Sequence, residues 1–276
     1  MSQRITNALT VDFEDWYQGL EIPHTAWTGL EDRIGHAARR LLDLLAEKRV
    51  RATFFILGTL AEKHPRLVGE IAAAGHEVGT HGWSHTMIYR MTPEAFCAEL
   101  RRSIVLLEQL SGQRIVGHRA PFFSITRRSL WALEILGQCG IRYDSSIFPV
   151  LNDRYGIEDS PRWPYPIEDG PAGALTEFPI TTWRILGRNV PVAGGAYFRI
   201  LPYLFTRTAF RAINRAGHPA VFYVHPWELD PDHPRIPLPR RIAVTHYANL
   251  RATEPRMRRL LSDFTFAPMK EVLGVG

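Results

Sequence analysis

Short apolar runs and amphipathic stretches alternate along the first half of this 276-residue chain. The apolar runs have the length of buried strands, which we predict at residues 8–13, 52–57, 76–80, 115–118 and 141–143. The stretches between them carry apolar residues at helical spacing and predict helices around 34–45 and at 60–74, 92–110 and 126–138. Thr92, followed by Pro93, is the expected cap of the third helix, and Thr126 that of the fourth. Such alternation predicts a parallel sheet with helices outside it.

Residues 147–200 interrupt this alternation. They are rich in proline, glycine and aromatic residues, and we expect an ordered insertion of loops and short strands near the mouth of a site. The alternation resumes with a helix at 202–215 and a strand at 220–224. A C-terminal extension, about 230–276, contains a basic helix at 255–262.

Polar residues stand at the carboxyl ends of several predicted strands. Asp12, His81, Arg119 and Asp144 each fall at or just after such an end. This is the end at which α/β barrels carry their active sites. The sequence therefore predicts a single-domain (β/α) barrel rather than a doubly wound sheet, and the chain length is ordinary for one.

The segment His81-Gly82-Trp83-Ser84-His85 holds two imidazoles four positions apart. That spacing brings both rings to one face if the segment turns helically. Near the N-terminus, an apolar run ends in Asp12-Phe13-Glu14-Asp15. Two histidines and a carboxylate with an open position form the ligand set of a catalytic divalent metal. This pattern indicates a hydrolase with a metal-activated water.

Composition and charge indicate which classes of binding partner to expect. Hydrophobic residues make up 45% and charged residues 22% of the chain, as in ordinary globular proteins. The net charge is +5, but the arginine clusters are scattered, and nucleic-acid binding would require one continuous basic stripe. We expect no nucleic-acid partner, whereas attraction to an acidic glycan or an anionic membrane surface stays open.

Cysteine usage and the apolar windows indicate the compartment. Cys97 and Cys139 lie in helix-like segments and are expected to be reduced thiols. No window approaches the ~20 apolar residues of a membrane span. Residues 1–7 show no apolar run typical of a signal peptide, so a cytoplasmic protein is expected.

Taken in order, these motifs resemble those of the polysaccharide deacetylases, the carbohydrate esterase family built on the NodB homology domain. The matching segments are Leu9–Asp12, His81–His85, Arg119–Phe122 (with Phe for the usual Tyr), Asp144 and Val224-His225. The resemblance implies a distorted, incomplete barrel, commonly of seven strands, that spans residues 1–276 as one domain.

The segments that flank these motifs resemble those of a narrower group, the deacetylases encoded in exopolysaccharide loci alongside exosortase systems. These segments are Val11–Tyr17, Tyr143–Pro149, Gly194–Arg199 and His246–Leu250. The resemblance implies an N-acetylated glycan as substrate and peripheral association with membrane-bound exopolysaccharide machinery. It leaves the oligomeric state open. The expected metal is Zn2+, with Co2+, Ni2+ and Fe2+ as alternatives.

The resemblance also implies roles for single residues. Asp12 is the expected base, paired with Arg119, and His225 the expected acid, hydrogen-bonded to Asp144. The metal carboxylate is Glu14 or Asp15, and the sequence leaves this choice open. The backbone N–H of Phe122 is a candidate oxyanion donor. Five aromatic residues are candidates for stacking on sugar rings: Trp16, Tyr17, Trp83, Tyr197 and Trp227.

Two other functions compete with this interpretation. One is an allantoinase-like amidase that acts on a small cyclic or ureido substrate, for which 147–200 would close a narrow pocket. The other is an inactive carbohydrate-binding protein of an export complex. The presence of Asp12, His81, His85, Arg119 and His225 favours an active enzyme over the second alternative.

Overall fold

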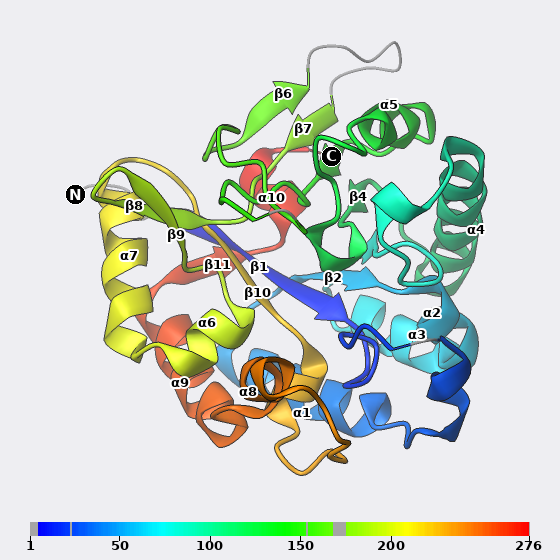
Figure 1. Ribbon diagram of the computed structural model, residues 1–276, viewed down its shortest axis with the longest axis horizontal. Helices are drawn as coiled ribbons and strands as arrows, with labels where there is room; N and C mark the ends of the chain where they lie inside the picture. The colour runs from blue at the N-terminus through cyan, green and yellow to red at the C-terminus, as the bar shows by residue number, and fades with distance from the viewer. Residues whose placement is uncertain (1–4, 23, 153, 168–174, 276) are drawn as a thin grey trace.

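A curled, mostly parallel sheet lies at the centre of the computed structural model, which describes residues 5–22, 24–152, 154–167 and 175–275 (Figure 1). The strand order is β10-β1-β2-β3-β4-β5-β7-β6, and β11 pairs with the first half of β1. All neighbours are parallel except β6 and β7. The strands are β1 (Thr6–Phe13), β2 (Thr53–Ile56), β3 (Glu77–Thr80), β4 (Gly117–His118), β5 (Tyr143–Asp144), β6 (Tyr165–Ile167), β7 (Leu175–Glu177), β10 (Val221–Val224) and β11 (Thr265–Ala267).

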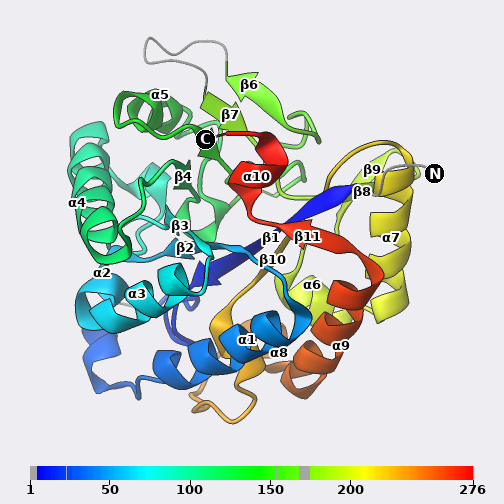
Figure 2. The same cartoon turned by 180° about the vertical axis from the view of Figure 1, so that it is seen from behind.

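Helices surround this sheet (Figures 1 and 2). They are α1 (Ile34–Lys48), α2 (Gly58–Lys63), α3 (Pro65–Ala73), α4 (Pro93–Ser111), α5 (Trp131–Gln138), α6 (Gly195–Ile200), α7 (Tyr203–Arg215), α8 (Arg240–Tyr247), α9 (Leu250–Asp263) and α10 (Met269–Leu273). The arrangement is the mixed α/β, incompletely closed barrel that the resemblance implied, but its sheet has nine strands among the described residues rather than seven.

The central strands are apolar because both of their faces are covered. Seven of the eight residues of β1 are buried, and β2 is buried throughout. Helices cover one face and the barrel interior the other, so these strands appear in the sequence as continuous apolar runs. Their parallel register brings the ends of β1, β2 and β3 to one edge of the sheet.

Two of the predicted helices differ from the structure. The helix predicted at 60–74 is two helices, α2 and α3, because Pro65 has no N–H to continue the first and begins the second. The helix predicted from Thr126 begins only at Trp131, and Thr126 does not cap it. Thr92 does cap α4: its side chain accepts a hydrogen bond from the Ala95 N–H at 3.2 Å.

Residues 147–200 contain loops, β6, α6 and the hairpin β8 (Thr182–Ile185)–β9 (Arg188–Pro191). They also contain β7, which pairs in parallel with β5 and is therefore part of the barrel wall. The sequence predicted short strands in this segment, but not that one of them is part of the barrel wall. Residues 153 and 168–174 of this segment lie outside the described part of the chain.

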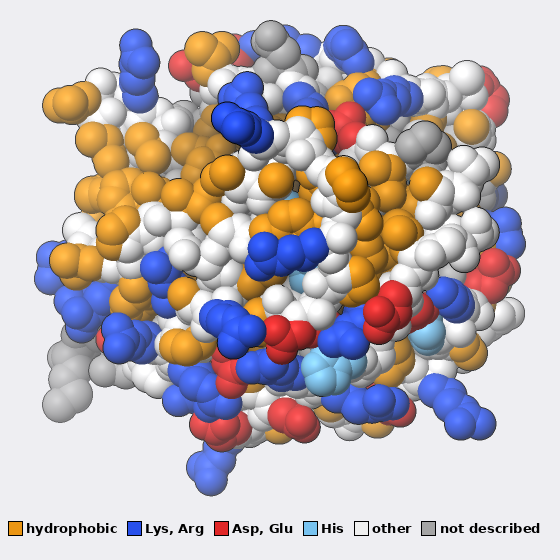
Figure 3. All heavy atoms as spheres, turned by 60° about the horizontal axis from the view of Figure 1, so that its bottom comes forward, with side chains coloured by type: hydrophobic (Ala, Val, Ile, Leu, Met, Phe, Trp, Pro, Cys, Tyr) orange, Lys and Arg blue, Asp and Glu red, His pale blue; other side chains and the backbone are white. Residues whose placement is uncertain are grey.

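The surface carries charges of both signs, and both cysteines are free thiols. On the face shown in Figure 3, Lys and Arg side chains are scattered among acidic and hydrophobic ones. Cys97 and Cys139 are free and half-buried. Within the described ranges, no helix is both long and apolar enough to cross a membrane.

Candidate active site

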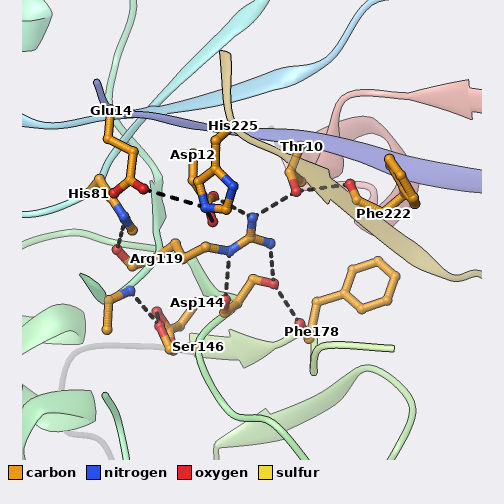
Figure 4. A network of polar contacts seen from close by, with 12 residues as sticks. Thr10, Asp12, Glu14, His81, Arg119, Asp144, Ser146, Phe178, Phe222 and His225 are labelled. Atoms are coloured by element: carbon orange, nitrogen blue, oxygen red, sulfur yellow. Dashed lines mark hydrogen bonds and ion pairs between the residues drawn. The ribbon is translucent and has the colours of Figure 1, made fainter. Parts of the chain in front are cut away.

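The polar residues identified in the sequence lie at the strand ends along one edge of the sheet. Asp12 is the second-last residue of β1, His81 follows β3, Arg119 follows β4, and His225 follows β10. Figure 4 shows their side chains converging, with Glu14 beside them. Because parallel strands end at a common edge, residues more than 200 positions apart in sequence meet here.

Glu14, His81 and His85 form a buried cluster whose ligand atoms all lie within 4.8 Å of one another. Oε2 of Glu14 is 2.6 Å from Nε2 of His85. Nδ1 of His81 is 2.8 Å from the carbonyl oxygen of Arg119, which leaves Nε2 free to act as a ligand. Two imidazole nitrogens and one carboxylate oxygen, buried together, fit a divalent cation.

The two histidines do not share a helix. The segment after β3 has no helical turn between them. Instead, Gly82 has a φ of 78° and His85 a φ of 60°, so two left-handed residues fold the loop until the rings lie 5.2 Å apart, centroid to centroid. A side chain at Gly82 would strain this turn. The four-residue spacing of His81 and His85 therefore reflects a compact loop rather than a helical turn.

Asp15 points away from the histidines. Its Oδ1 accepts a hydrogen bond from the Trp16 N–H at 2.8 Å, and its Oδ2 accepts from the N–H groups of Arg33 at 2.8 Å and Ile34 at 3.1 Å. The last two belong to the start of α1, so Asp15 stabilises that helix end. Burial raises the pKa of Asp15 to about 6. Of the two carboxylates that the sequence left open, Glu14 is the one beside the histidines.

The protonation states suit metal binding. Burial alone would raise the pKa of Glu14, but the nearby imidazoles of His85 and His225 bring it down to about 2. Burial lowers the pKa of His81 to about 4. At neutral pH the cluster thus presents a carboxylate and a neutral imidazole, the forms that bind a cation.

Arg119 is fully buried and holds Asp12. Nη1 of Arg119 donates to Oδ1 of Asp12 at 2.7 Å and to Oγ1 of Thr10 at 2.7 Å. Its Nε and Nη2 donate to the carbonyl and hydroxyl of Ser145, both at 2.9 Å. These bonds fix the guanidinium, which occupies Oδ1 of Asp12 and leaves Oδ2 directed into the site (Figure 4).

His225 faces the same space from β10. Its Nε2 lies 3.6 Å from Oε1 of Glu14 and 3.9 Å from Oδ2 of Asp12. Its Nδ1 lies 2.8 Å from Oε1 of Glu228. Burial would lower the pKa of His225, but the carboxylates of Glu14 and Glu228 outweigh burial and raise it to about 9.

Asp144 does not contact His225, contrary to the sequence prediction. Its Oδ1 lies 2.7 Å from Nδ1 of His118 and accepts a hydrogen bond from the Ser146 hydroxyl at 2.7 Å. The Ser146 hydroxyl in turn accepts from the Ala120 N–H at 2.7 Å. Since β4 pairs with β5 directly, Asp144 supports the loop after β4, which carries Arg119 and Phe122.

Most of the predicted sugar-stacking aromatics are enclosed. Trp16, Tyr17, Trp83 and Trp227 all expose less than a tenth of their surface. The Arg102 guanidinium covers the ring of Trp83 at 3.5 Å from its centroid. These rings therefore pack within the protein. Tyr197 is half-buried, and its hydroxyl lies 3.4 Å from that of Tyr155.

Trp227 and Phe122 border the cluster directly. Trp227 stacks on His225 with the ring centroids 5.3 Å apart, and its Nε1 donates to Oε1 of Glu14 at 3.4 Å. Phe122 is half-buried, with a φ of 54° and its ring 4.6 Å from that of His85, centroid to centroid. Phe122 therefore lies between the cluster and the solvent.

A cavity of about 480 Å³ adjoins the cluster at His85 and Phe122. The segment after β1 supplies much of its wall, including Glu21, His24 and Trp27, and the loop after His85 supplies Met87 and Arg90. Sequence reasoning did not identify this wall. The available signal was the tryptophan at position 27, shortly after the first motif.

Residues 147–200 reach this cavity through Arg154. The Arg154 guanidinium lies 5.0 Å from the centre of the Phe122 ring and 2.6 Å from Oε1 of Glu21. Glu21 also pairs with Arg90 at 3.6 Å. The segment therefore borders the mouth of the site, next to the cavity wall.

Comparisons with known proteins agree with this geometry. The family model described as polysaccharide deacetylase matches residues 23–143, and a domain of unknown function (DUF3473) matches residues 145–274. The peptidoglycan-N-acetylglucosamine deacetylase of Bacillus cereus is 34% identical over 96 residues, which are 34% of this chain and 35% of that protein. The chain thus matches about a third of the length of this curated relative.

Solved structures share the fold. A candidate polysaccharide deacetylase from Mycobacterium smegmatis aligns with a TM-score of 0.65 at 22% identity, covering 98% of this chain and 90% of that one. A pseudoenzyme of carbohydrate esterase family 4 from Bacillus anthracis aligns with a TM-score of 0.54 at 14% identity, covering 100% and 67%. Since a pseudoenzyme has this fold too, the fold alone does not establish deacetylase activity, which depends on the residues of the site.

Proposed function

This chain carries a domain of the polysaccharide deacetylase family, and on that premise we propose that it is a metal-dependent hydrolase that removes N-acetyl groups from the amino sugars of a polysaccharide. The observation that carries the proposal is the buried cluster of Glu14, His81 and His85, with Asp12 and His225 facing the same space. A binding protein does not require a histidine whose Nε2 lies 3.9 Å from the Asp12 carboxylate and 3.6 Å from the Glu14 carboxylate of a metal cluster.

The chain's own groups supply the proton transfers. A bound divalent cation would contribute Lewis acidity, lowering the pKa of a water and polarising the amide carbonyl. Oδ2 of Asp12 accepts the proton of the attacking water, because Arg119 occupies Oδ1. Nε2 of His225 donates a proton to the amide nitrogen as the C–N bond breaks, which yields acetate and a free amine. These two atoms lie 3.9 Å apart, which supports their acting on the same amide group.

The proposal extends to the oxyanion and to the metal. The backbone N–H of Phe122 is our candidate donor to the oxyanion, since this residue lies against His85. Asp144 then acts indirectly, by supporting the loop that carries Phe122. Zn2+ is the proposed ion because a site with two histidines and one carboxylate is common for catalytic zinc.

The substrate is proposed from the cavity and the resemblance together. N-acetylglucosamine or N-acetylgalactosamine units of an exopolysaccharide are the proposed substrates, with the cavity beside His85 as the place where the neighbouring sugar binds. Peripheral association with membrane-bound exopolysaccharide machinery and a cytoplasmic location remain part of the proposal.

We also propose that residues 1–276 form one domain, although two family models match it. The support is the sheet: β7 and β10, from the second matched region, pair with β5 and β1. The second region therefore contributes strands to the barrel, rather than folding as a separate unit beside it.

The decisive test is acetate release from a panel of N-acetylated oligosaccharides and lipid-linked intermediates, with and without chelator. The proposal requires release that chelator abolishes and added Zn2+ restores. Allantoin and related ureido compounds belong in the panel, because their hydrolysis without acetate release would support the small-molecule amidase instead. Glycan binding with no hydrolysis of any substrate would support the inactive binding protein.

A further inference from the structure

Glu228 is a buried carboxylate to which neither sequence motifs nor family matches assign a role. It lies in the short 3-10 helix Pro226–Leu229 that directly follows His225, and only 1% of its surface is exposed. Its Oε1 lies 2.8 Å from Nδ1 of His225 and accepts a hydrogen bond from the His225 backbone N–H at 3.1 Å. One carboxylate oxygen of Glu228 therefore contacts both the imidazole and the backbone N–H of His225.

The other oxygen of Glu228 is held by Arg199. Nε of Arg199 donates to Oε2 of Glu228 at 2.6 Å, and Arg199 is also 1% exposed. The remaining N–H groups of Arg199 donate to the carbonyl oxygens of Thr245 at 2.7 Å, His246 at 3.0 Å and Ala248 at 2.8 Å. These carbonyls end α8, so the guanidinium is anchored at a helix C-terminus, where a positive charge is favoured.

Trp227 completes the support. Its ring stacks on His225 on one side, 5.3 Å between centroids, and on His246 at 4.4 Å, with the Arg199 guanidinium 5.4 Å from its centre. The plane of the His225 imidazole is thus set by Trp227, and its rotation within that plane by Glu228. With Nδ1 occupied, Nε2 is the nitrogen directed at Asp12.

We propose that Glu228, anchored by Arg199, is the positioning residue of His225, and that this assembly is what residues 145–274 contribute to catalysis. The inference rests on the proposed function and deepens it. Asp12 and the metal cluster lie before residue 145, whereas His225, Glu228 and Arg199 all lie in the region matched by the domain of unknown function. That region therefore supplies the acid of the reaction together with its support.

The substitution Glu228→Gln tests this contact with little change of shape. A glutamine has one acceptor and one donor end. If its oxygen faces His225, its NH2 meets the Nε–H of Arg199; if its oxygen faces Arg199, its NH2 meets the backbone N–H of His225. Either orientation sets two donors against each other in a buried site, so the chain of contacts from Arg199 through residue 228 to His225 cannot stay intact.

A double-mutant cycle separates positioning from general support. We would measure kcat and KM for acetate release in the wild type, Glu228→Gln, His225→Ala and the double variant. Glu228→Gln should lower kcat about 10- to 100-fold, as loss of a supporting partner commonly does, with KM changed by less than about twofold. In the His225→Ala background the same substitution should cost less than about twofold, because the residue it positions is gone.

Glu254→Gln is the matched control, because it also removes a carboxylate paired with arginines, Arg40 and Arg258, but on the surface. It should leave kcat unchanged. Wild-type kcat in Glu228→Gln would overturn the inference. So would an equal loss of activity with and without His225, since that pattern means that Glu228 only supports the fold.

Proton NMR gives a readout that needs no substrate and separates this inference from the proposed function. An imidazole N–H donating to a buried carboxylate gives a low-field, slowly exchanging signal, and His225 should show one that is absent from His225→Ala. Glu228→Gln should lose that signal, while the signal from the His118–Asp144 pair serves as an internal control and persists. Persistence of the His225 signal in Glu228→Gln would overturn the inference. A wild type that shows the signal but releases no acetate would contradict only the proposed function.

Discussion

Asp15→Asn and Glu14→Gln should separate a structural carboxylate from a metal ligand. In Asp15→Asn, an amide oriented to keep the two bonds from Arg33 and Ile34 turns its NH2 towards the Trp16 N–H. Leaving that buried N–H without an acceptor costs about 2 kcal/mol. Loss of the negative charge at the start of α1 adds about 0.5–1 kcal/mol. The free energy of unfolding should therefore fall by roughly 2.5–3 kcal/mol, which lowers the Tm by roughly 5–12 °C in a domain of this size.

Metal binding should be kept in Asp15→Asn and largely lost in Glu14→Gln. The assay is calorimetric unfolding at pH 8, where Asp15, whose pKa burial raises to about 6, is ionised. Scans with chelator and with saturating Zn2+ give the metal-induced rise in Tm, because a ligand that binds only the folded state stabilises it. Asp15→Asn should start from a lower Tm and keep that rise. Glu14→Gln should lose most of it, since Glu14 is the carboxylate next to His85.

Two results would refute this reasoning. The first is a metal-induced rise that disappears in Asp15→Asn and persists in Glu14→Gln, which would exchange the two roles. The second is an unchanged Tm of Asp15→Asn in chelator, which would mean that its contacts with the start of α1 contribute nothing to stability. Elemental analysis of the purified variants provides an independent count of bound metal.

Three further predictions follow from the same site. His81→Ala should purify without metal and without acetate release but with an unchanged circular dichroism spectrum, and full activity of the metal-free variant would contradict the metal hydrolase. Asp12→Asn should keep its metal by elemental analysis and lose activity, because an amide cannot accept the proton of water. His225 has a folded-state pKa raised from 6.5 to about 9, so its stabilisation is present below pH 6.5 and is lost as the pH rises through 9. The Tm of the chelator-treated protein should fall over that interval, and His225→Ala should remove this part of the fall.

The fold could be predicted where its elements are long and buried on both sides. β1 and β2 form continuous apolar runs, and α4 carries a threonine cap followed by proline, so local sequence and tertiary structure agree. The place of β7 in the barrel wall could not be predicted from its own residues. Its pairing with β5 depends on where the barrel wall has a free edge, which is a property of the whole sheet.

The site could be predicted as a set of residues but not as a set of contacts. The choice between Glu14 and Asp15 depends on which way each side chain leaves the turn after β1, and the contact with Arg33, 18 residues later, decides it. The partner of Asp144 depends on strand pairing, which places His118 beside it. Glu228 did leave a local signal, since a glutamate three residues after a helix cap commonly bonds back to it.

Strand register joins β1, which precedes the first matched region, to β10 of the second matched region at one site. Val11 of β1 lies opposite Val224 of β10, so the next residues, Asp12 and His225, emerge together at the same level. A slip of one residue would turn His225 to the opposite face of the sheet, because side chains alternate along a strand. The apolar residues on both strands prevent that slip: Val11 and Val224 are buried in the same core cluster. The 3.9 Å between Asp12 and His225 therefore depends on packing on the far side of the sheet, and the second matched region cannot form this pair without β1.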